Sequence, residues 1–75
     1  MVIFTQHALL KLAQRNIKKE FVLKTLTAPD TTGVSYSGRQ MAFKQFGRIH
    51  LKVVFQQEGE NLIVLTQHWV EKYNQ

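Results

Sequence analysis

The sequence predicts an α+β fold in which two N-terminal helices pack on one face of an antiparallel sheet of three to four strands. Apolar residues recur at helical spacing before Pro29, and β-forming residues follow it. Turn residues separate the strand-like segments at Ser37-Gly38, at Gly47 and at Glu58–Asn61. At 75 residues, the chain forms a single domain over 1–75 with a thin core, which a homo-oligomer or a bound partner would extend.

The first helix is predicted from about Gln6 to Arg15. Thr5 is a suitable N-cap, because its hydroxyl can accept from the free N–H groups of the first turn. Asn16 tolerates the left-handed conformation that often follows a helix end. The apolar stripe of this helix consists of Ala8, Leu9, Leu12 and Ala13.

A second helix is predicted from Ile17 to Ala28, and Pro29 ends it because the residue before a proline disfavours helical geometry. Its apolar face consists of Phe21, Val22, Thr25 and Leu26.

Four segments after Pro29 are predicted strands. They are Thr31–Tyr36, Arg39–Phe46, Arg48–Gln56 and the nearly continuous apolar segment Leu62–Trp69. The short apolar segment Val2–Phe4 is expected to be an edge strand or a docked terminus.

The charge balance favours an anionic partner. Ten Lys and Arg against five acidic residues give a formal charge of +5, which suits nucleic acid, an acidic protein or a membrane surface. The sequence has no cysteine, no apolar segment long enough to span a membrane and no signal-peptide pattern at its start. We therefore expect a cytoplasmic protein without disulfides.

His7, Lys11 and Arg15, which we call the helix row, recur at every fourth position of the first predicted helix. Side chains at this spacing lie on one helix face. One imidazole and two cations could bind backbone phosphate or assist proton transfer on it. The alternative is an ordinary solvated face of an amphipathic helix.

Arg48, His50 and Lys52, the strand row, alternate with apolar residues. This alternation places the strand row on one face of the sheet. The same pattern is typical of the polar residues of any half-exposed antiparallel strand, which is the alternative interpretation. Arg39 and Lys44 of the neighbouring strand could extend this cationic surface, although the position of Lys44 depends on a register that the sequence leaves open.

The C-terminal residues supply a third group. His68 is a candidate acid or base, and Tyr73 is a candidate for stacking on an unpaired RNA base. We expect Trp69 to close the edge of the core. The spacing of the three histidines and the scatter of the carboxylates predict no metal site, and no Gly-rich phosphate loop is present, so no cofactor is expected.

Several of these residues together resemble a known family. His7-Ala8, Lys11, Arg15-Asn16-Ile17 and Ala28-Pro29-Asp30, followed by Val64-Leu65-Thr66, are similar to the motifs of a family of small bacterial and phage proteins classed as a domain of unknown function, the 4258 family. Its members usually have arginine, glycine and Ser or Thr where this chain has Lys11, Asn16 and Lys18. Lysine keeps the charge of arginine but loses its bidentate phosphate geometry.

The resemblance implies an architecture similar to RelE-like and BrnT-like toxins, which are metal-independent ribonucleases of toxin–antitoxin modules. It therefore implies a toxin-type protein that binds RNA, either free or on the ribosome, and that pairs with an acidic antitoxin. His7, His50 and His68 would then be the catalytic candidates. The phosphate-binding candidates are Lys11, Arg15, Arg39, Lys44, Arg48 and Lys52. The alternative function is a non-catalytic basic binding module, such as a phage or mobile-element accessory protein or a degenerate toxin relative.

Overall fold

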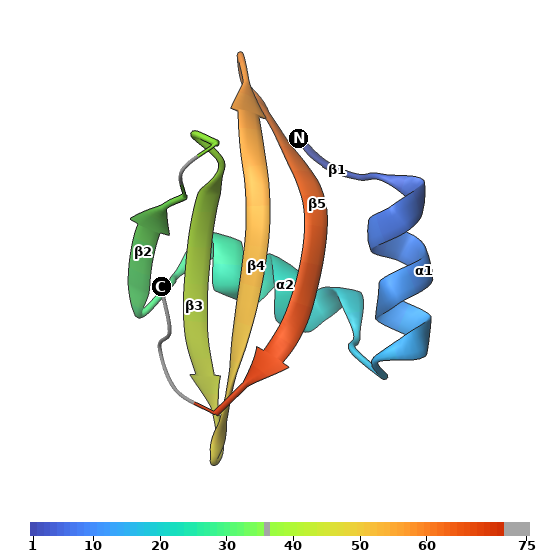
Figure 1. Ribbon diagram of the computed structural model, residues 1–75, viewed down its shortest axis with the longest axis vertical. Coiled ribbons are helices and arrows are strands. Elements are labelled where there is room, and N and C mark those ends of the chain that lie inside the picture. Colours follow the sequence, from blue (N-terminus) through green and yellow to red (C-terminus); the bar gives the residue numbers. More distant parts are fainter. Residues whose placement is uncertain (36, 72–75) are drawn as a thin grey trace.

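The computed structural model describes residues 1–35 and 37–71. In this part of the chain, two helices and five strands follow one another (Figure 1). The helices are α1 (Gln6–Gln14) and α2 (Lys19–Thr27). The strands are β1 (Val2–Phe4), β2 (Thr31–Val34), β3 (Gln40–Phe46), β4 (Ile49–Glu58) and β5 (Asn61–Val70). The predicted α+β class is confirmed.

The sheet is five-stranded and mixed, with the order β1-β5-β4-β3-β2. The three pairings among β2, β3, β4 and β5 are antiparallel, whereas β1 pairs with β5 in parallel, from Val2 opposite Leu62 to Phe4 opposite Val64. The expectation of three to four antiparallel strands was therefore wrong. The N-terminal segment is an edge strand, and its position beside β5 makes the sheet mixed.

The caps predicted for α1 are present. The hydroxyl of Thr5 accepts a hydrogen bond from the Ala8 N–H at 3.0 Å. Arg15 is the C-cap, and Asn16 adopts the left-handed conformation with φ of 55°. Asparagine tolerates this conformation better than most non-glycine residues, so a local choice in the sequence ends α1 and turns the chain towards α2.

Helix α2 begins two residues later than the sequence predicts. Lys18 is extended, with φ of −86° and ψ of 142°, and Ile17 is buried in the core rather than helical. The helix ends at Thr27, two residues before Pro29. An apolar residue in the connection thus adds to the core without lengthening the helix.

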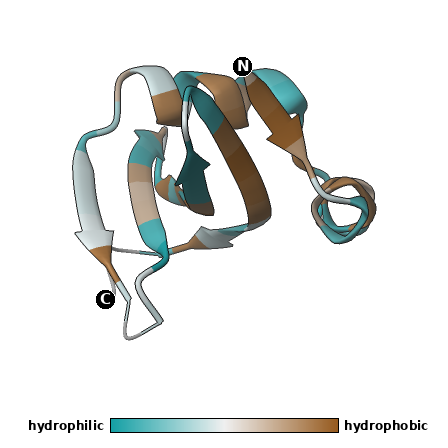
Figure 2. Cartoon of the chain, turned by 90° about the horizontal axis from the view of Figure 1, so that it is seen from above, coloured by the Kyte–Doolittle hydropathy of each residue, from teal (hydrophilic) through white to brown (hydrophobic). Residues whose placement is uncertain are grey.

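Both helices contribute to one core on one face of the sheet. Helix α2 packs across β3 and β4, while α1 lies at the edge formed by β1 and β5 and appears nearly end-on in Figure 2. The buried core consists of Ala8, Leu12, Ile17, Val22, Ala42, Leu51, Val53, Phe55 and Val64.

Aromatic rings close the core at one end. The ring of Phe21 lies 4.8 Å from that of Phe46 and 6.2 Å from that of Trp69, in tilted and edge-on arrangements respectively. The indole Nε1 of Trp69 donates to the backbone oxygen of Arg15 at 3.3 Å. These contacts confirm the predicted position of Trp69 and tie the end of α1 to β5.

Alternation along β4 separates two environments. Leu51, Val53 and Phe55 are buried on the helix side, whereas His50 and Lys52 point to the other side of the sheet. We call this second side the helix-free face. None of the helices in the described residues is long and apolar enough to cross a membrane.

Candidate anion-binding site

Lys52 of β4 and His68 of β5 are direct cross-strand partners on the helix-free face. Side chains paired in this way have Cβ atoms about 4.5 to 5.5 Å apart. On the other side of Lys52, its Nζ lies 5.9 Å from the ring centroid of Phe43, the partner of Lys52 on β3. This cation–π contact helps to fix the ammonium group over the sheet.

A break in the β4–β5 register determines that His68 faces Lys52. Val54 pairs with Thr66 and Phe55 pairs with Val64, so Leu65 is an extra residue in β5. A bulge of this kind reverses which face the following residues point to. Val64 is buried on the helix side before the bulge and Gln67 is buried there after it, so Thr66 and His68 turn to the helix-free face.

Arg15 joins Lys52 and His68 from the end of α1. Strand β1 pairs only with residues 62–64 of β5, and α1 follows the remaining open edge. The Arg15 Nη1 donates to the backbone oxygen of Gln67 at 2.8 Å and to the Thr66 hydroxyl at 3.4 Å. Both bonds use Nη1, and within residues 1–35 and 37–71 Nη2 and Nε have no hydrogen bond, so they are available to a ligand.

The electrostatics of His68 reflect this arrangement. Desolvation by partial burial lowers its pKa from 6.5, and the positive charges of Lys52 and Arg15 lower it further. His68 is therefore neutral at pH 7 and can accept a proton. We call Arg15, Lys52 and His68 together the anion site, because Lys52 is the cross-strand partner of His68 and both cations lie close enough to the imidazole to lower its pKa.

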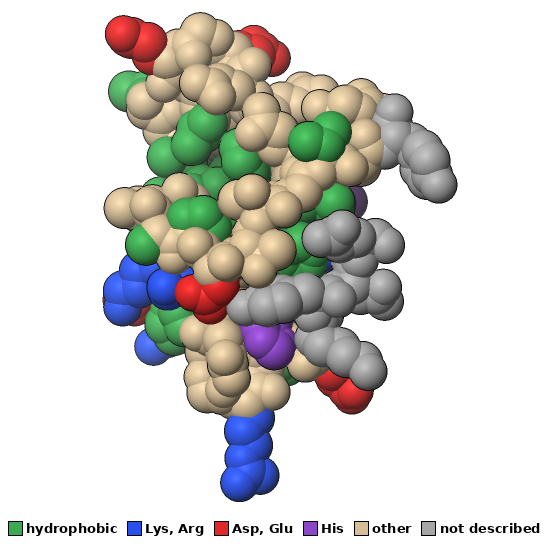
Figure 3. All heavy atoms as spheres, turned by 90° about the vertical axis from the view of Figure 1, so that its left-hand side faces the viewer, with side chains coloured by type: hydrophobic (Ala, Val, Ile, Leu, Met, Phe, Trp, Pro, Cys, Tyr) green, Lys and Arg blue, Asp and Glu red, His purple; other side chains and the backbone are tan. Residues whose placement is uncertain are grey.

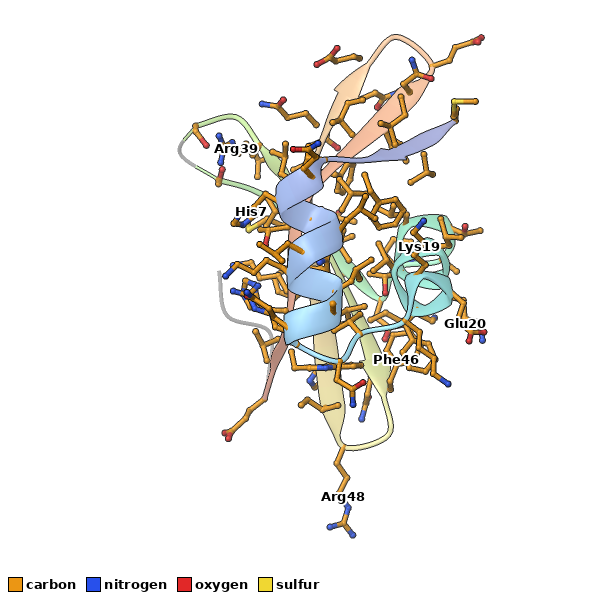
Figure 4. The ribbon with its side chains drawn as sticks, turned by 90° about the vertical axis from the view of Figure 1, so that its right-hand side faces the viewer. His7, Lys19, Glu20, Arg39, Phe46 and Arg48 are labelled. Atoms are coloured by element: carbon orange, nitrogen blue, oxygen red, sulfur yellow. The ribbon has the colours of Figure 1, made fainter. Side chains whose placement is uncertain are left out.

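The other two members of the helix row have different positions. The Lys11 Nζ donates to the Gln14 side chain at 3.0 Å, within α1. His7 is exposed and lies on the side of the molecule away from α2, as does Arg39 (Figure 4). His7 is eight residues before Arg15, which is about 12 Å along a helix. It is therefore not part of the anion site.

His50 lies on the helix-free face two residues before Lys52. Its Nδ1 donates to the backbone oxygen of Glu71 at 3.1 Å. This bond fixes the orientation of the imidazole and directs Nε2 away from Glu71. His50 is therefore beside the anion site as predicted, with one ring nitrogen already engaged.

Two of the predicted phosphate-binding residues lie elsewhere. Lys44 pairs with Leu51 and so points to the helix side, where its Nζ donates to the Ala28 backbone oxygen at 3.0 Å and approaches Asp30 at 3.9 Å. Arg48 precedes β4 in the Gly47 turn and projects from the tip of the β3–β4 hairpin (Figure 4). Neither side chain extends the cationic surface around Lys52.

The side of the molecule bordered by β2 has mixed charge. Acidic side chains lie beside Lys and Arg there (Figure 3), so positive charge on this side is partly balanced. Tyr73, the predicted base-stacking residue, lies outside the described residues. No cluster of three or more His, Asp or Glu side chains suited to a metal ion occurs within 1–35 and 37–71.

Sequence reasoning missed Thr66 and Phe43 as neighbours of the site. Thr66 is beside the Arg15 guanidinium, and Phe43 supports Lys52. Leu62–Trp69 is apolar at most positions, so its alternation could not reveal which side Thr66 faces. Phe43 lies between Ala42 and Lys44 in the sequence, and nothing local indicates which residue it faces. Its pairing with Lys52 is set by the register of β3 and β4.

Comparisons with known proteins add no assignment: no family model matches the chain, and no curated protein or solved structure gives a significant match.

Proposed function

We propose that this chain is a toxin-type RNA-binding protein and a metal-independent ribonuclease. The proposal is carried by one observation, the position of His68 opposite Lys52 and near Arg15, both of which lower its pKa. It agrees with the resemblance to the 4258 family and with the net charge of +5. The biological setting that we propose is a toxin–antitoxin module in the cytoplasm, with an acidic protein as antitoxin.

The chemistry of such a site is general acid–base catalysis on RNA. Neutral His68 takes the proton of a ribose 2′-hydroxyl as the 2′-oxygen forms a bond to phosphorus. Lys52 and Arg15 hold the phosphate oxygens and stabilise the negative charge that develops there. The bond from phosphorus to the 5′-oxygen then breaks, and a second group returns a proton to that oxygen. His50, which lies beside the site, is the candidate for this second group.

A test of the ribonuclease uses purified protein, single-stranded RNA and EDTA. We expect cleavage by the wild type and none by His68→Gln, while RNA binding persists. Lys19→Gln removes one positive charge on the α2 side (Figure 4) and serves as the control for net charge. A protein that leaves RNA intact both free and on ribosomes is not a ribonuclease.

The alternative, a non-catalytic basic binding module, is favoured by one specific observation. His50 uses one nitrogen for Glu71, and His7 lies about two helical turns from Arg15, so among the histidines of the described residues only His68 belongs to the anion site itself. A binding module would bind RNA with an affinity that falls steeply with salt and would form no product. Product formation in EDTA that is lost in His68→Gln separates the two functions.

A further inference from the structure

The anion site combines three groups from three elements that can all be positive. Lys52 comes from β4, His68 from β5 and Arg15 from the end of α1. Lys and Arg side chains are cationic at neutral pH, and imidazole becomes cationic when it binds a proton. The charged groups that lower the pKa of His68 are Lys52 and Arg15, and no carboxylate of the described residues contributes to this shift. The site can therefore match more than one negative charge.

We infer that the anion site selects the dianionic phosphate of a terminal phosphomonoester over the single negative charge of an internal phosphodiester. This inference rests on the proposed RNA-binding function and names the part of an RNA that binds most tightly. A phosphomonoester carries a charge of about −1.5 to −2 at pH 7, because its second pKa is about 6. A phosphodiester carries one charge and has two non-bridging oxygens, whereas a terminal phosphate has three.

The geometry of the donors supports a group with three free oxygens. The Nη1 bond to the backbone oxygen of Gln67 holds the guanidinium at the edge of β5, which leaves the other N–H groups of Arg15 for one oxygen. Lys52 presents its ammonium group from the neighbouring strand. His68 provides a third donor once it is protonated. The three donors belong to β4, β5 and the end of α1, and we expect them to contact separate oxygens of one phosphate.

Proton uptake should accompany binding of the dianion. Without a ligand, desolvation lowers the pKa of His68 most, and the positive charges of Lys52 and Arg15 lower it further. A phosphate between the three groups cancels that repulsion and favours the imidazolium form. His50, on the same face two residues before Lys52, is a second titratable group near the ligand, so His50→Gln is needed to assign the proton to His68.

The experiment compares RNA oligonucleotides of one sequence that end in a 3′-phosphate, a 5′-phosphate or hydroxyls at both ends. All carry 2′-O-methyl groups, which prevent cleavage. We expect binding about tenfold tighter for a phosphate-ended strand at pH 7, equivalent to about 1.4 kcal/mol. The end that confers this preference identifies the polarity of the bound strand. Calorimetry in buffers of different ionisation enthalpy should show proton uptake that is lost in His68→Gln and kept in His50→Gln.

Matched variants locate the effect. Lys52→Gln and His68→Gln should remove the preference for a terminal phosphate, whereas Lys19→Gln should weaken all three strands equally and keep the preference. Equal binding of all three strands by the wild type would overturn the inference and leave RNA binding intact. A protein that binds none of the strands would overturn the proposed function as well, so the two failures are distinguishable.

Discussion

Replacing Arg15 tests the connection between α1 and β5 on which the anion site depends. In Arg15→Gln, the charged donor to the Gln67 backbone oxygen at 2.8 Å is lost, together with the longer contact to the Thr66 hydroxyl at 3.4 Å. A hydrogen bond to a charged group contributes about 1.5 to 3 kcal/mol. Arg15 is only half-buried, and water can reach the open edge of β5, so we take the lower end, about 1.5 kcal/mol.

For a domain of this size, about 1.5 kcal/mol corresponds to a fall in Tm of about 6 to 12 °C. Thermal unfolding followed by far-UV circular dichroism measures it. Arg15→Lys keeps the charge but not the planar fork, so it should recover most of the RNA affinity and little of the stability. An Arg15→Gln protein as stable as the wild type would refute the role of this bond in holding α1 to β5.

Three further predictions concern separate parts of the molecule. Thr5→Ala removes the cap on the Ala8 N–H and should lower the free energy of unfolding by about 1 kcal/mol, measured by urea denaturation. The pKa of His68 is lower in the folded state than in the unfolded state, so the unfolded state binds more protons as the pH falls through 6.5. The free energy of unfolding therefore decreases over this range and levels off once the pH is below the pKa of His68 in the folded state. His68→Gln should flatten this part of the stability profile, and an unchanged slope would contradict the assignment. Lys44→Met should leave RNA affinity nearly unchanged, whereas Lys52→Met should reduce it, as filter binding at two salt concentrations would show.

Local signals in the sequence were enough for most of the elements. Thr5 and Pro29 mark helix limits correctly because capping and the geometry before proline are short-range effects. The parallel position of β1 was not predictable in this way. Val2–Phe4 is only three residues long, and its partners begin at Leu62, so nothing near it in the sequence specifies the pairing.

The site shows the same division between local and long-range information. Alternation along β4 correctly placed His50 and Lys52 on one face. The face of His68 depends on the bulge at Leu65, which the apolar segment around it conceals. The meeting of Arg15 with these residues depends on how α1 docks, which is a tertiary property. Of the two predicted rows, the structure therefore places Arg15 and Lys52 beside His68, while His7, Lys11 and Arg48 lie apart from the anion site.

The parallel pairing of β1 with β5 has a consequence for the order in which the molecule assembles. Strands β2 to β5 connect through short turns, whereas β1 and α1 contact residues about sixty positions further along the chain. Contacts between such distant segments are the slowest to form. Arg15 belongs to this late-docking unit, and Lys52 and His68 belong to the hairpin that can form without it. Opening of the first seventeen residues would dismantle the anion site while the antiparallel strands remain paired, so binding capacity and the integrity of the sheet can be lost separately.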